Sequence, residues 1–169
     1  MARVLLLLTT FGVLAAWAGA QGGPPPLDPA DRAKLFKTDR ALLDQLVNHS
    51  LDLSKADNPL RQAQECQAAA RTLAVYLRRA AADERDAARV AEMAGLLTDL
   101  VRDGLAPNLR VARQTFPDTS PQGEQVKQLG ESALKDLEAW AAIPEGTVAD
   151  DGTVKAAFVA LSELKAKLK

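Results

Sequence analysis

The chain has 169 residues, and its 21 Lys and Arg residues are balanced by 22 Asp and Glu residues, which gives a formal net charge of −1. Hydrophobic residues make up 47% and charged residues 25%, a globular composition that excludes low-complexity, collagen-like and disulfide-stapled chains. We expect no nucleic-acid partner, because this balance supplies no broad positive field to attract phosphates.

Residues 1–20 are predicted to form a secretory signal peptide. A short basic start at Met1–Arg3 precedes a mainly apolar stretch over Val4–Trp17, and the small residues Ala18–Ala20 suit a signal-peptidase site. The apolar stretch is shorter than the roughly 20 residues that span a bilayer comfortably. We therefore expect export to the periplasm or the medium, cleavage after Ala20, and no membrane span in the mature chain. An uncleaved N-terminal anchor is the alternative.

The remaining chain is predicted to be helical throughout. Residues 21–28 are rich in Gly and Pro and form a short tether, and residues 29–169 form one bundle domain. Strand signals are almost absent, since Ile143 is the only isoleucine and no run alternates apolar with polar residues. The predicted fold class is all-α, an up-and-down helical bundle of four to five helices.

The first predicted helix opens at Asp28-Pro29, where a capping carboxylate precedes a proline at the first turn. Apolar residues at helical spacing are predicted to form one face that runs toward Leu53. They are Leu35, Phe36, Leu42, Leu43, Leu46 and Val47.

The second predicted helix starts in the same way, at Asn58-Pro59. Its seam repeats at intervals of three and four residues, as in a helical bundle. The seam residues are Ala63, Cys66, Ala70, Leu73, Leu77 and Ala80. The apolar register changes near residues 81–86, where we expect a turn and a new cap at Asp83; one continuous rod is the alternative.

The third helix is predicted to end near Gly104 and to resume after a kink at Pro107. A loop follows, and Ser120-Pro121 opens a fourth helix that stops before Pro144. The last amphipathic helix is predicted to run from Val154 toward the C-terminus, after a cap in the Asp150–Thr153 segment.

Cys66 has no partner cysteine in the chain, so no internal disulfide is possible. Its position in the second seam favours a buried apolar thiol. Pairing with another chain and a reactive or ligating role are the alternatives.

Motifs that would indicate an enzyme or a bound cofactor are absent. The sequence has no haem-attachment, zinc-protease, di-iron, phosphate-loop or nucleophile-elbow motif. We therefore predict no catalytic, metal or cofactor-binding residue and no cofactor. His49 is the single histidine, and we expect it on the surface near the end of the first helix.

A group of arginines is the one candidate interaction face. Arg71 and Arg78 are seven residues apart beside the second seam, so they share a face of that helix. Arg79 lies nearby, and Arg110 and Arg113 form a second basic spot without flanking acids. A solvated face whose charges are paired with neighbouring acids is the alternative interpretation.

Part of the chain resembles a group of small exported all-helical proteins of GC-rich bacteria. The similar residues are the run from Asn58-Pro59-Leu60 through Cys66 to Leu73, and Gly104–Leu109 downstream. The resemblance covers about the middle third of the chain and carries over no catalytic residue. Some members are associated with envelope-stress or sigma-factor regulation, which implies a protein-binding role.

Three functions are compatible with these observations. The first is a non-enzymatic exported bundle that binds another protein or a cell-envelope component. The second is a small-ligand or metal carrier with a pocket between helices, for which Glu92, Asp99 and Asp103 are candidate carboxylates. The third is an enzyme of unknown class that uses His49 or a pair of carboxylates.

Overall fold

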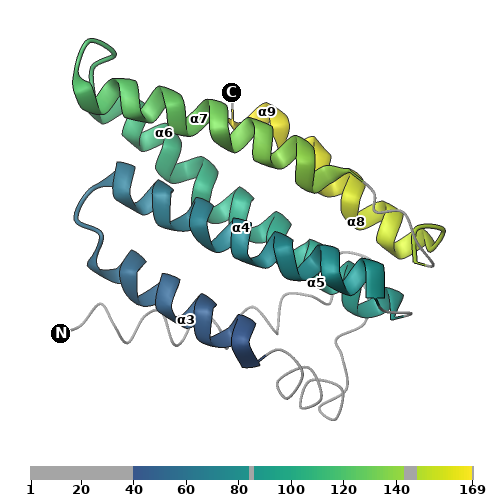
Figure 1. Cartoon of the computed structure of the whole chain (residues 1–169). Helices are drawn as coiled ribbons and strands as arrows, with labels where there is room; N and C mark the ends of the chain where they lie inside the picture. Colours follow the sequence, from purple (N-terminus) through teal and green to yellow (C-terminus); the bar gives the residue numbers. More distant parts are fainter. Residues whose placement is uncertain (1–39, 84–85, 143–147, 169) are drawn as a thin grey trace, which may run out of the picture.

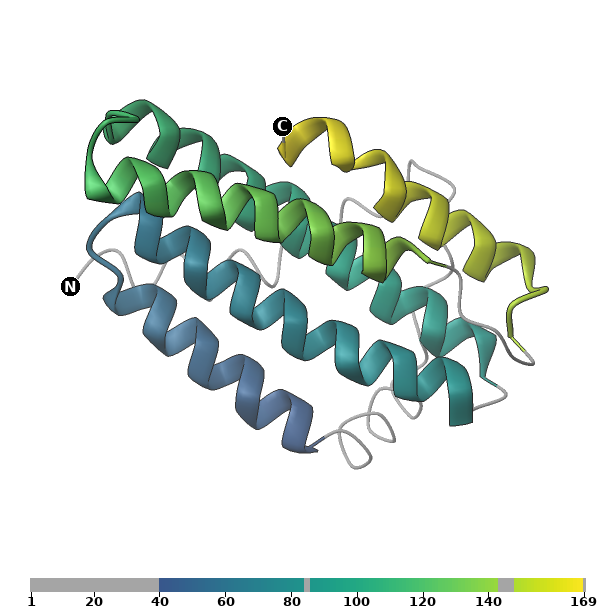
Figure 2. The same ribbon diagram turned by 45° about the horizontal axis from the view of Figure 1, so that its top comes forward.

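A computed structural model describes residues 40–83, 86–142 and 148–168, and all regular structure in these ranges is helical. The helical rods of the described part are, in chain order, α3 (Arg40–Lys55), α4 (Pro59–Asp83), the continuous rod of α5 (Ala87–Asp99), η1 (Leu100–Leu105) and α6 (Ala106–Thr115), and then α7 (Pro121–Ala141) and α8 (Gly152–Glu163). These rods run alternately in opposite directions, so the described part of the chain is an up-and-down helical bundle (Figures 1 and 2). The all-α prediction is therefore confirmed. The predicted signal peptide, the tether and the opening at Asp28-Pro29 lie outside the described residues. No helix of the described part is long and apolar enough to cross a membrane.

Helix α3 (Arg40–Lys55) lies at the edge of the bundle and packs against α4 (Pro59–Asp83), as Figure 1 shows. Leu35 and Phe36 of the predicted apolar face lie outside the described residues, and the rest of that face is only partly buried. Leu42 is buried and Leu46 half-buried against the core, whereas the side chain of Val47 is 56% exposed. The apolar residues of α3 cover a wider arc than contact with one neighbouring helix can bury.

Helix α4 carries the predicted seam, and all six seam residues are buried. The carbonyl oxygen of the Asn58 side chain accepts a hydrogen bond of 2.9 Å from the Arg61 N–H, which confirms the predicted cap. The predicted turn is also confirmed, because α4 ends at Asp83 and α5 (Ala87–Asp99) begins after residue 86. The cap of α5 is Asp86 and not Asp83, since the Asp86 carboxylate accepts from the Arg89 N–H.

The third helix does not end at Gly104. It passes without a break from α5 through a π-helical segment, η1 (Leu100–Leu105), into α6 (Ala106–Thr115). The Ala106 N–H donates to the Val101 carbonyl, five residues back. This wider turn moves the preceding carbonyls away from the ring of Pro107, so the proline fits inside a helix that it would otherwise break. Gly104 faces α4, where an added Cβ would lie 3.1 Å from the Cys66 sulfur.

Helices α7 (Pro121–Ala141), α8 (Gly152–Glu163) and the short α9 (Lys165–Leu168) complete the bundle. Ser120 and Asp151 cap α7 and α8 through their side chains, as the sequence predicts. α8 packs along α5, and α4 lies against α5, η1, α6 and α7. Trp140 and Phe158 are buried in the resulting core, together with Cys66, which is 2% exposed.

Candidate functional site

Two of the predicted face arginines bind α7. Arg71 Nε donates to Asp136 Oδ2 at 2.7 Å, and its terminal nitrogen donates to Ser132 Oγ at 2.7 Å. The amide of the buried Gln67 donates to the same Asp136 oxygen at 2.7 Å. Arg78 donates to the carbonyl of Ala139 near the end of α7. These side chains therefore hold α4 against α7.

The other three predicted arginines lie apart from this α4–α7 contact. The guanidinium of Arg79 lies 5.7 Å from the centre of the Tyr76 ring on the same helix. Arg113, on α6, donates at 2.7 Å to the carbonyl of Leu168 in α9. Arg110 is exposed on α6. The five arginines are thus distributed over two helices, and at least three of them donate to groups within the chain.

The outer side of α3 carries a partly exposed apolar stripe. Leu43, Val47 and Leu51 are spaced one turn apart, and Val47 and Leu51 are 56% and 52% exposed. We call these three residues the α3 stripe. Sequence analysis missed the stripe because spacing alone does not tell which part of a wide apolar arc a neighbouring helix covers.

The side chain of His49 is 25% exposed, so it lies partly at the surface, and its ring faces α4. Its Nε2 lies 3.2 Å from the Thr72 hydroxyl, and its Nδ1 lies 3.5 Å from Glu65 Oε2. Glu65 and Thr72 are seven residues apart on α4, so they lie on the same side of that helix. The imidazole therefore bridges them and joins the centre of α3 to α4. Motif analysis could not have found this contact, because it depends on how α3 and α4 pack side by side.

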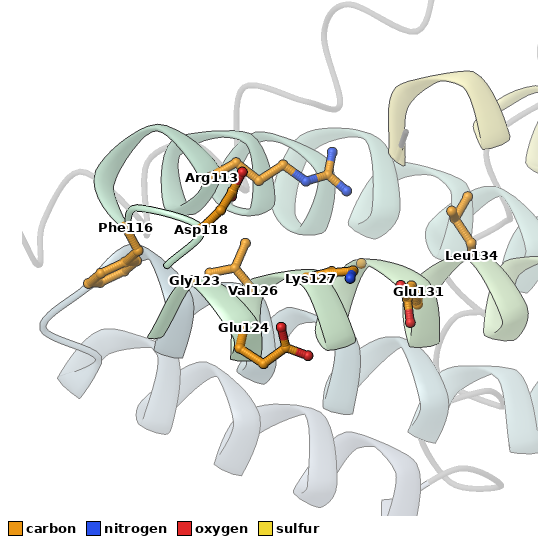
Figure 3. A pocket seen from close by; sticks show the side chains of 10 residues that line it. Arg113, Phe116, Asp118, Gly123, Glu124, Val126, Lys127, Glu131 and Leu134 are labelled. Carbon is orange, nitrogen blue, oxygen red and sulfur yellow. The ribbon is translucent and has the colours of Figure 1, made fainter. Parts of the chain in front are cut away.

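A recess of about 760 Å³ lies at the α6–α7 turn (Figure 3). Arg113 extends along it, with Phe116 at one end and Leu134 at the other. Gly123 and Gly130 line it from α7. A side chain at Gly123 would collide with the backbone of Pro117, and one at Gly130 would displace the Arg113 guanidinium. Its charged residues carry both signs. They are Arg113, Lys127, Asp118, Glu124 and Glu131.

A second recess, of about 360 Å³, lies on the other side of Phe116, between the first turns of α4 and α7. Its lining is mainly uncharged and polar, since Gln64, Gln122 and Gln125 contribute three amides. Leu60 provides a buried apolar wall, and of the described residues that line the recess Arg61 alone is charged. We call this the amide recess.

Groups that could bind a metal do not cluster in the ranges that the structure describes. No set of three or more His, Cys, Asp and Glu side chains there could hold a metal ion. Burial raises the pKa of the Cys66 thiol, which the side chain of Asn108 contacts at 3.8 Å. The arrangement keeps the thiol protonated at neutral pH.

No protein-family model, curated protein or solved structure matches this chain.

Proposed function

We propose that the protein is an exported helical bundle without catalytic activity of its own, and that it binds a partner protein of the cell envelope through α3. The observation that carries the proposal is the α3 stripe. Its three apolar residues recur at i, i+4 and i+8, the spacing with which one helix meets another. The expected occupant is an amphipathic helix of the partner.

The position of α3 supports this role. Among the described helices, α3 packs mainly on α4, so no other described helix is packed closely on its outer side (Figure 2). The contact of His49 with Glu65 and Thr72 fixes the rotation of α3 about its axis, which keeps the stripe pointing outward. An apolar surface held outward in this way is typical of a contact surface. Export itself rests on the predicted signal peptide.

The test compares the Val47→Asp/Leu51→Asp variant with Val159→Asp as the matched control. Val159, on α8, is as exposed as Leu51, at 52%, but lies outside the stripe. After cross-linking in the native host, wild type and the control variant should retain the same envelope protein, and the double variant should lose it. Equal retention by the double variant, or no retained protein with wild type, would contradict the proposal.

Binding of a small ligand is the second candidate, and the two recesses beside Phe116 favour it. Their volumes, about 760 and about 360 Å³, fall in the range of small-molecule sites. Thermal unfolding with metals, haem, lipids and sugars tests this candidate, because a ligand that binds the folded state raises the melting temperature. Unchanged melting curves across the panel would reject it.

A further inference from the structure

The amide recess has the chemistry of a site for a neutral, strongly hydrogen-bonding ligand. Each glutamine amide offers an N–H₂ donor and a carbonyl acceptor without carrying a charge. The side chains of Gln64, Gln122 and Gln125 are exposed, and none of them hydrogen-bonds to another group in the described part of the chain. Three such amides around one recess can pair with a ligand that presents several donors and acceptors close together.

Two helices begin at this recess, but little remains there to attract an anion. Asn58 and Ser120 accept hydrogen bonds from first-turn N–H groups of α4 and α7. The prolines that follow them, at 59 and 121, have no N–H to offer. Arg61 lies 3.9 Å from the Asp57 carboxylate, which offsets its charge. The recess therefore favours an uncharged ligand.

The walls also contain apolar surface. Phe116 is half-buried and contributes an aromatic ring, and Leu60, which is 5% exposed, contributes a buried aliphatic wall. A pyranose ring combines hydroxyl groups on its rim with an apolar C–H face that packs on aromatic rings. An acetamido substituent adds one donor, one acceptor and a methyl group, which match the amides and the leucine.

We propose that the amide recess binds a neutral oligosaccharide that carries acetamido groups. The glutamines pair with its hydroxyl and acetamido groups, while Phe116 and Leu60 contact its C–H face and methyl group. The site is independent of the α3 stripe. It gives the protein a second contact, to a glycan of the cell envelope.

The test uses three probes with the purified protein: an N-acetylglucosamine trimer, a glucose trimer that lacks acetamido groups, and inorganic sulfate. Isothermal titration calorimetry measures affinity, and the amide NMR spectrum locates the bound probe. We expect saturable binding of the acetamido sugar, affinity for the glucose trimer weaker by about tenfold or more, and no binding of sulfate. Binding of sulfate in preference to sugar would overturn the proposal.

Variants connect the binding to the recess. Gln122→Ala/Gln125→Ala should weaken sugar binding by about tenfold or more without unfolding the protein, because both side chains are exposed. Gln128→Ala is the matched control on α7, since the Gln128 amide donates a hydrogen bond to Glu124 and lies outside the recess. Gln64→Ala, on α4, tests the opposite wall should the double variant fold poorly.

Equal affinity in wild type and the double variant, or no sugar binding by wild type, would overturn the proposal. The α3 variant Val47→Asp/Leu51→Asp should keep full sugar affinity. Loss of the protein partner and loss of the glycan are therefore distinguishable results.

Discussion

Replacing Gly123 with alanine tests how the recesses at the α6–α7 turn are built. Gly123 lies in the first turn of α7, where the preceding loop crosses the helix closely. A Cβ added to Gly123 would lie 2.0 Å from the carbonyl oxygen of Pro117 and 2.9 Å from Asp118 Cα. Both atoms belong to the backbone, so no side-chain rotation can relieve the contact. The loop itself has to move.

The magnitude follows from the contacts that this movement breaks. Non-bonded heavy atoms pack best at about 3.5 Å, so the Pro117 carbonyl must retreat by roughly 1.5 Å. That carbonyl accepts from the Ser120 N–H at 2.9 Å and from the Ser120 hydroxyl at 2.7 Å, and Ser120 also caps α7. Loss of two hydrogen bonds and the cap costs about 3 kcal/mol. Alanine returns about 1 kcal/mol of helix propensity, which leaves a destabilisation of about 2 kcal/mol.

Urea unfolding followed by circular dichroism measures this change, with Gly95→Ala as the control. Gly95 lies inside α5, and an added Cβ there meets no atom within 4 Å. Gly95→Ala should therefore stabilise the protein by about 1 kcal/mol. In thermal unfolding, the melting temperature should fall by about 4–8 °C for Gly123→Ala and rise by about 2–4 °C for Gly95→Ala. A Gly123→Ala protein as stable as wild type would refute the reasoning.

Three further predictions concern single side chains. Asp136→Ala should destabilise the protein by about 1–2 kcal/mol in urea, because it removes an acceptor from the buried Gln67 and from Arg71; no change would show that Ser132 alone suffices. Hydrogen bonds from the N–H groups of Val154 and Thr153 lower the pKa of Asp151. The Asp151 carboxylate should stabilise the folded protein fully above the ordinary carboxyl pKa, and this stabilisation should disappear as the pH falls through the lowered pKa of Asp151. The urea midpoints of wild type and Asp151→Ala should therefore move closer together in acid. The Cys66 thiol should react with a disulfide reagent only after unfolding; fast reaction of the folded protein would contradict its burial.

The fold could be predicted from the sequence where local chemistry decides it. Asn58 and Ser120 precede prolines, and their side chains cap α4 and α7 as expected. The buried seam around Cys66 could be predicted because α4 is covered on most sides, so most of its apolar residues are buried. The π-helical turn could not be predicted, because glycine and proline, here Gly104 and Pro107, are the residue types that most often mark the end of a helix.

The candidate site was much less predictable, because it depends on contacts between helices distant in sequence. The arginine spacing correctly placed Arg71 and Arg78 beside the second seam. It did not show that Asp136 and the Ala139 carbonyl lie opposite them. Likewise, the amide recess joins residues of α4 and α7 that have no common motif.

The π-helical segment η1 has a consequence for how the protein tolerates changes in length. Its extra residue per turn offsets the rotation of α5 relative to α6 by about one residue, roughly 100° about the helix axis. Deleting one residue from Leu100–Leu105 would restore a uniform α-helix and rotate Val90 and Leu97 away from their buried positions. A single-codon deletion that many helix-connecting turns would accept is therefore incompatible with the core at this position.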